Sequence, residues 1–130
     1  MLALQTLLWG VPFASHKIAG RKLPAYRWTI TGVAFGSIVS PASLGLYALG
    51  FYLPYVCVVP AIVGLLSFML HGTPGYQLAI MLGLQDPRLV VDDSGLAAID
   101  ALNAVIWGAI YGSAGYALDR WRRPLRPRGL

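Results

Sequence analysis

A long stretch without charged side chains constrains this chain more than any other feature. From Trp28 to Gln85 the sequence contains no Lys, Arg, Asp or Glu. A helix that crosses the bilayer core needs about 20 apolar residues, so this stretch has room for two spans and a further segment. Only 12% of the 130 residues are charged and 57% are hydrophobic, against about 25% and about 45–50% in soluble domains. The sequence therefore predicts an integral membrane protein with a single domain.

The fold class follows from the backbone's need for hydrogen bonds. In lipid only helices and closed barrels satisfy every backbone group, and the sequence lacks the alternating pattern of barrel strands. We expect an all-α integral membrane protein with two to three transmembrane helices plus short interfacial or re-entrant helices.

Positive charge is concentrated beside the apolar segments. Nine of the ten basic residues form two clusters, which are Lys17, Arg21, Lys22 and Arg27 in the first and Arg120, Arg122, Arg123, Arg126 and Arg128 in the second. Basic residues next to spans stay near anionic lipid on the cytoplasmic side, so we expect head-group anchors and a cytoplasmic carboxyl-terminal tail, in an inner or plasma membrane. The tail could instead dock a partner protein. This clustering argues against nucleic acid as the partner, despite the net charge of +5.

Prolines and polar clusters suggest how the chain is divided. Pro12 is expected to end a short interfacial helix, whose alternative is an inserted arm packed on another subunit. Pro41 predicts either a kinked span or a re-entrant hairpin, with Ser40 and Ser43 bonding the freed carbonyls. The expected segments are an interfacial segment at 1–15, a basic connector at 16–27, the kinked span or hairpin at 28–53, a span at 54–71, a loop at 72–95 with a short helix at 74–84, a span at 95–118, and a basic tail at 119–130.

Helix signals define the second half more closely. Thr73 can cap a helix that starts at Pro74, and Asp93 or Ser94 can cap the last span. Pro124 is expected to end that span.

These segments give a conflict in topology. Two cytoplasmic basic clusters need an even number of crossings between them, but the segments count three. Either the segment with Pro41 is a hairpin, or the first cluster lies on the outer side.

Small residues form smooth faces on two of the predicted spans. They are Gly32 and Gly36 in the first and Ala104, Gly108, Gly112 and Gly115 in the last. Because small residues let helices approach closely in lipid, we expect these faces to pack together, within one chain or between copies.

Three polar residues are candidates for chemistry. Asp100 with Asn103 lies on one stripe of the last span, and an ionisable residue inside a span usually faces a partner or water. Such a pair could relay a proton or bind a cation, but Asp100 could equally lie at the interface. His71 could ligate a haem or a magnesium pigment, although a structural role at the head-group boundary fits its place at the end of an apolar segment.

The remaining features indicate no enzyme. No nucleophile elbow, zinc motif, phosphate loop or dinucleotide fingerprint is present, and the lone Cys57 cannot form a four-thiolate metal site. We expect a non-catalytic structural or assembly subunit of a larger membrane complex, which docks through its glycine-rich faces onto other subunits or onto itself. The alternatives are an oligomeric transporter or proton conductor, and a pigment- or quinone-binding subunit with an apolar pocket near the aromatic residues at 47–55. No cofactor or metal is predicted beyond bound lipid.

Overall fold

The computed structural model describes residues 2–53, 58–89, 91 and 93–122, and the regular elements of this part of the chain are all helices, without any strand. The elements are α1 (Leu2–Lys22), the short 3₁₀ helix η1 (Pro24–Tyr26), α2 (Arg27–Tyr52), α3 (Val58–Met81) and α4 (Asp93–Arg122). The all-helical prediction is confirmed. Among the described residues three helical stretches are long and apolar enough to cross a membrane, which are Pro24–Gly50, Val58–Met81 and Ser94–Arg122.

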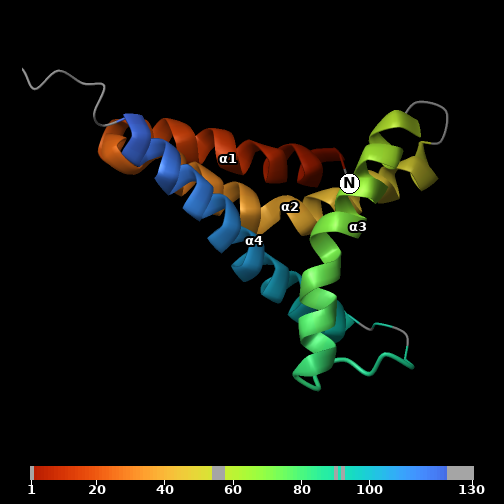
Figure 1. Cartoon of the computed structure of the whole chain (residues 1–130). Coiled ribbons are helices and arrows are strands. Elements are labelled where there is room, and N and C mark those ends of the chain that lie inside the picture. Colours follow the sequence, from red (N-terminus) through yellow and green to blue (C-terminus); the bar gives the residue numbers. More distant parts are fainter. Residues whose placement is uncertain (1, 54–57, 90, 92, 123–130) are drawn as a thin grey trace, which may run out of the picture.

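The helices form an open arrangement around α2 (Figure 1). The first helix, α1, runs back along the first half of α2, and α4 packs along the same half of α2 from another side. From this shared end α2 and α4 diverge like the arms of a V, and α3 runs across the open end between them. The three helices meet at the point where α2 and α4 begin to diverge, because the middle of α3 contacts both of them there.

Glycines set the close approach of α2 and α4. A methyl group on Gly32 or Gly36 would lie 2.2 Å from the backbone carbonyl oxygen of Tyr111 or Trp107, and one on Gly115 would lie 2.2 Å from that of Trp28. Real side-chain carbons essentially never come this close to another atom. The two helices can therefore lie at this separation only because glycine has no side chain at these contacts. The two small-residue faces thus lie against each other inside one chain.

The predicted helix end at Pro12 is wrong, and of the two alternatives at Pro41 the structure has the single span and not the re-entrant hairpin. Both prolines lie inside continuous helices, so α1 extends through the expected connector to Lys22, and α2 is one helix rather than a hairpin. A proline removes one backbone donor, but hydroxyl groups hold the neighbouring turns, since Ser15 donates to the Val11 carbonyl and Ser43 to the Val39 carbonyl. In apolar surroundings such bonds let a helix continue past a proline.

The predicted loop with a helix at 74–84 is also wrong. The third helix, α3, passes through Pro74 without a break, and Thr73 is no cap because its hydroxyl donates to the Met69 carbonyl inside the helix. The helix ends where Gly83 adopts a left-handed conformation, with φ of 70°. There the Leu84 amide bonds to the Ala79 carbonyl at 2.9 Å, and the Gly83 amide to the Ile80 carbonyl at 3.0 Å. These two bonds form a Schellman motif, which only a residue tolerant of positive φ completes readily.

The expected spans at 54–71 and 95–118 differ from the helices mainly at their ends. Residues 54–57 lie outside the described part of the chain, and α3 begins at Val58, which places Pro60 in the first turn, where a proline costs no hydrogen bond. The last helix, α4, begins at Asp93 and extends to Arg122. The predicted stop at Pro124 lies outside the described residues.

Asp119 ties the end of α4 to the start of α2. Its carboxylate accepts bonds from the backbone N–H of Trp28 at 3.1 Å and from the N–H and hydroxyl of Thr29, both at 2.8 Å. The first turn of α2 has no acidic residue, and Tyr26 provides no side-chain cap. The buried Asp119 therefore supplies both the acceptors and the negative charge that a helix start requires.

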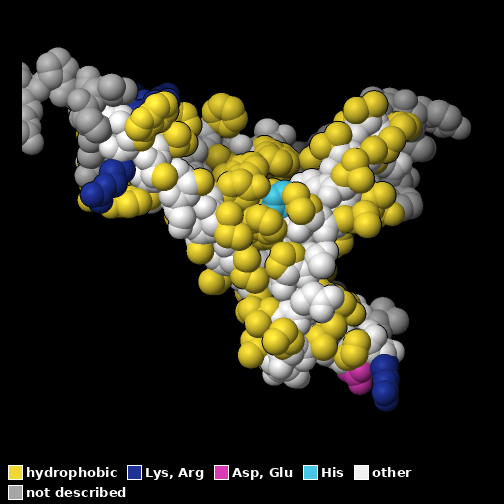
Figure 2. All heavy atoms as spheres, viewed as in Figure 1, with side chains coloured by type: hydrophobic (Ala, Val, Ile, Leu, Met, Phe, Trp, Pro, Cys, Tyr) yellow, Lys and Arg dark blue, Asp and Glu magenta, His cyan; other side chains and the backbone are white. Residues whose placement is uncertain are grey.

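This cap brings the two basic clusters to one end of the molecule. Figure 2 shows Lys and Arg side chains there and at the far end, and between them the visible face is largely hydrophobic. At the far end the loop between α3 and α4 carries the exposed Asp86 and Arg88. The side of the membrane that each cluster faces stays a prediction.

Candidate functional site: a polar junction of three helices

Polar side chains from α2, α3 and α4 meet where the three helices cross. The contributors are Ser40 and Ser43 from α2, Ser67 and His71 from α3, and Asp100, Asn103, Trp107 and Tyr111 from α4. The junction thus unites the three candidate residues, Asp100, Asn103 and His71. No buried side-chain nitrogen or oxygen of the described residues lacks a hydrogen-bond partner.

Asn103 is the centre of the junction and is completely buried, with 0% of its surface exposed. Its oxygen accepts a bond from the Gly75 amide at 2.7 Å. Its nitrogen donates to the Gly72 carbonyl at 3.1 Å and, more weakly, to the Ser40 hydroxyl at 3.4 Å. One amide side chain of α4 thereby binds both other helices.

These bonds explain why α3 continues through Pro74. The backbone around a helical proline has lost part of its regular ladder. Asn103 bonds to the backbone of Gly72 and Gly75, and the Trp107 indole N–H donates to the His71 carbonyl at 2.8 Å. Side chains of α4 therefore support the stretch of α3 that the sequence suggested was a turn.

The contact at Gly75 is also a steric requirement. A methyl group there would lie 2.5 Å from the side-chain oxygen of Asn103 and 2.6 Å from the Ile99 carbonyl oxygen. Glycine at this position lets the amide of α3 reach Asn103 directly.

Asp100 lies at the edge of the junction and is partly exposed. One carboxylate oxygen accepts a bond from the buried Ser40 hydroxyl at 3.0 Å. The described residues contain no group of three or more His, Cys, Asp or Glu side chains that could hold a metal ion. Asp100 can accept or release a proton through its partly exposed carboxylate.

His71 is buried in the middle of the junction, with 6% of its surface exposed. Its Nδ1 lies 2.8 Å from the Ser67 carbonyl oxygen, which can only accept, so Nδ1 carries the hydrogen. Its Nε2 then accepts a bond from the Tyr111 hydroxyl at 2.9 Å. With both nitrogens engaged, a metal or pigment could bind only after displacing Tyr111. The helix α3 extends ten residues beyond His71 to Met81, and the position of His71 relative to the head groups stays a prediction.

Hydroxyl and aromatic groups extend the junction on both sides. Ser67 links His71 to α2, since its hydroxyl lies 3.2 Å from Nδ1 and 2.7 Å from the Ser43 hydroxyl. The Tyr111 ring packs edge-on against Phe35, with centroids 5.0 Å apart. Sequence reasoning missed Ser67, although its position four residues before His71 on a helix places the two side chains together.

The other predicted residues are placed as follows. The glycine faces lie between α2 and α4, away from the outer surface. The basic residues Lys17, Arg21, Lys22, Arg27, Arg120 and Arg122 lie on α1, at the start of α2 and at the end of α4. Arg123, Arg126, Arg128, Tyr55 and Cys57 lie outside the described residues.

Comparison with protein-family models, curated proteins and solved structures gives no match. The function of the chain is therefore inferred from its own geometry.

Proposed function

We propose that this chain is a non-catalytic subunit of the membrane, which assembles with other membrane helices and holds them in position. The observation that carries the proposal is the hydrogen bonding of Asn103, a fully buried amide side chain whose oxygen and nitrogen both bond to neighbouring helices and so join three helices. Polar side chains that act as interhelical links stabilise one arrangement of helices in lipid. An active site would instead need polar groups left accessible to a substrate.

The outer apolar faces, and not the glycine faces, are the docking surface in this proposal. The glycine faces are already covered within the chain. Exposed apolar side chains on the outer face of α3 are available for lipid or partner helices, and they include Val59, Leu66, Met69 and Leu70.

The arrangement also supports a topology for the proposed subunit. Both basic clusters lie at one end, and α3 joins the far ends of α2 and α4 (Figure 1). If that basic end faces the cytoplasm, α2 and α4 make two crossings, and α3 adds none. This even number removes the conflict between three apolar segments and two cytoplasmic clusters.

The proposal is tested by gentle extraction from the native membrane and mass analysis of the intact particle. A particle that contains this chain with other membrane proteins at a fixed ratio supports it. A lone monomer, together with no crosslinked partner in native membranes, refutes it. An absorption spectrum of the same particle tests for a bound pigment or quinone.

A second candidate function is proton or cation conduction by an oligomer. The observation that favours it is the partly exposed Asp100 carboxylate beside Ser40, one turn from Asn103. In liposomes, Asp100→Asn should then abolish flux through the protein while leaving its oligomeric state unchanged. Flux that is absent from the wild type, or equal in the variant, refutes this candidate.

A further inference from the structure

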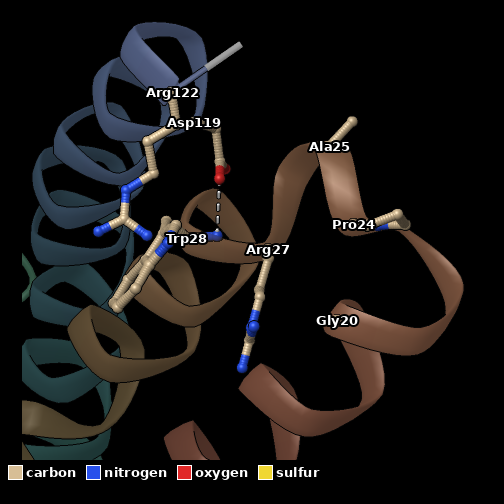
Figure 3. A pocket seen from close by; sticks show the side chains of 7 residues that line it. All are labelled: Gly20, Pro24, Ala25, Arg27, Trp28, Asp119 and Arg122. Carbon is tan, nitrogen blue, oxygen red and sulfur yellow. Dashed lines mark hydrogen bonds between the residues drawn. The ribbon is translucent and has the colours of Figure 1, made fainter. Parts of the chain in front are cut away.

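The basic end of the molecule contains a cavity of about 560 Å³ between α1, η1, α2 and α4. Its walls are formed by Gly20, Pro24, Ala25, Arg27, Trp28, Asp119 and Arg122. Figure 3 shows Arg122 extending from α4 beside the Trp28 indole, and Arg27 extending from the start of α2 toward α1. Two guanidinium groups from different helices thus line one hollow.

Packing contacts position the two arginines. The Arg122 guanidinium carbon lies 4.9 Å from the centroid of the Trp28 ring, a cation–π contact that leaves its N–H groups able to donate. The Arg27 side chain packs against Gly20, where an added methyl group would lie 3.1 Å from Nε. Guanidinium groups placed in this way suit a phosphate, whose oxygens accept from their N–H groups.

Asp119 also lines the cavity, and its carboxylate accepts hydrogen bonds from the start of α2. One oxygen accepts from the Trp28 amide, and the other accepts from the amide and hydroxyl of Thr29. The carboxylate therefore balances the positive start of α2. The cavity lining thus carries two guanidinium groups and one carboxylate, and its net positive charge favours an anion.

An apolar groove lies next to this cavity. It has a volume of about 260 Å³ and is lined by Pro12, Phe13, His16, Trp28 and Thr31, so Trp28 forms a wall of both spaces. Phe13 is 82% exposed there, and the His16 ring packs edge-on against Trp28 with centroids 4.7 Å apart. A ligand with a charged group and an adjoining hydrocarbon chain fits this pair of spaces better than a free anion does.

We infer that the cavity and groove together bind one anionic phospholipid. Its phosphate lies between Arg27 and Arg122, and one acyl chain follows the groove between α1 and α2 on the far side of the Trp28 indole. The position at the basic end, next to apolar helices, is where membrane proteins meet anionic head groups. This binding site is independent of whether the chain acts as a structural subunit.

The test uses the full chain, purified in a neutral detergent and stripped of lipid. Native mass spectrometry measures binding of phosphatidylglycerol and of phosphatidylcholine with the same acyl chains. The expected result is one phosphatidylglycerol per chain, bound at least about tenfold more tightly than phosphatidylcholine. Equal binding of the two lipids overturns the inference.

Charge-removing variants locate the site. Arg27→Gln combined with Arg122→Gln should weaken phosphatidylglycerol binding about 25-fold, at about fivefold for each arginine near an anionic surface. The matched control is Lys17→Gln with Arg120→Gln, which removes the same charge from the same end without touching the cavity, and its loss should stay below about threefold. Equal losses in the two double variants would show general surface attraction and overturn the site.

Two further measurements distinguish a lipid from a free anion and do not depend on the arginine variants. Phe13→Gln changes a largely exposed side chain of the groove, so the fold is retained, and it should weaken phosphatidylglycerol binding about threefold to tenfold. Inorganic phosphate at millimolar concentration should leave the bound lipid in place. Displacement by phosphate, or unchanged lipid affinity in Phe13→Gln, would show a site for a free anion and overturn the lipid assignment.

Discussion

Gly36→Ala is the sharpest test of how α2 and α4 pack. The added methyl group would lie 2.2 Å from the Trp107 carbonyl oxygen and 2.6 Å from the Gly108 amide nitrogen, whereas an ordinary contact begins at 3.4 Å. Because both neighbours are backbone atoms, the helices must separate locally by the difference between the 2.2 Å distance and the 3.4 Å of an ordinary contact, about 1.2 Å. Overpacking of this kind costs about 1–3 kcal/mol.

The separation also weakens the polar junction one turn away. The bond from Ser40 to Asp100 is 3.0 Å long, and a shift of this size would take it beyond hydrogen-bonding distance. With about 0.6 kcal/mol for each interhelical bond in a membrane protein, the total loss should be about 2–4 kcal/mol. The higher helix propensity of alanine offsets at most about 1 kcal/mol of this.

Reversible unfolding in mixed micelles, followed by tryptophan fluorescence as the fraction of dodecyl sulfate rises, measures this loss. Gly10→Ala is the matched control, because a methyl group there has no atom within 4 Å. A milder variant is Gly108→Ala, where the methyl group would lie 3.3 Å from the Ser37 hydroxyl oxygen and 3.8 Å from the Val33 carbonyl oxygen. If Gly36→Ala unfolds at the same dodecyl sulfate fraction as Gly10→Ala, the proposed close contact of α2 and α4 is refuted.

Three further predictions address the junction, the first helix and the topology. Asn103→Ala removes three interhelical bonds and should lower the free energy of unfolding by about 2 kcal/mol in the same assay, and an unchanged value would contradict its linking role. Burial, and to a lesser extent the nearby Arg27, lower the pKa of His16 from its usual 6.5. The unfolded state therefore binds more protons, and stability should fall as the pH drops below about 6.5 toward the lower folded pKa. Thermal unfolding between pH 5 and 7.5 should show this slope in the wild type and a smaller one in His16→Gln. In a variant whose native cysteine is replaced by alanine, Leu53→Cys and Leu89→Cys should react with an impermeant maleimide from the same side of the membrane, whereas labelling from opposite sides would mean that α3 crosses.

The sequence predicted the helical class because hydropathy depends on composition over long windows. The charge-free region from Trp28 to Gln85 predicts apolar helices, whatever their mutual packing. The small-residue faces were also visible in the sequence, because helical periodicity alone places Gly32 and Gly36 on one side of a helix.

The helix ends were harder to predict because their causes lie far away in the sequence. Pro74 suggested a helix start by local rules, but Asn103 supports the backbone on either side of it from 28 and 31 residues away. Local signals cannot show which backbone groups a distant side chain will satisfy.

The candidate site was identified in part. Asp100 and Asn103 stood out because polar residues inside apolar helices are costly. Their partners on α2 and α3 are serines and glycines, which are common residues with many other uses. Asp119 was overlooked because an acid at the carboxyl end of a helix has no evident local role, and its role lies at the start of another helix.

The Asp119 cap has a consequence for how the chain is made. The amide of Thr29 and its acceptor are 90 residues apart in the sequence. At about 5–20 residues per second, the ribosome needs about 5–18 s to extend the chain from one to the other. During that interval α2 has no acidic group at its start, so this link between α2 and α4 can form only after residue 119 has been made. A chain that stops before residue 119 would lack this acceptor, and the first amides of α2 would then have to bond to water instead.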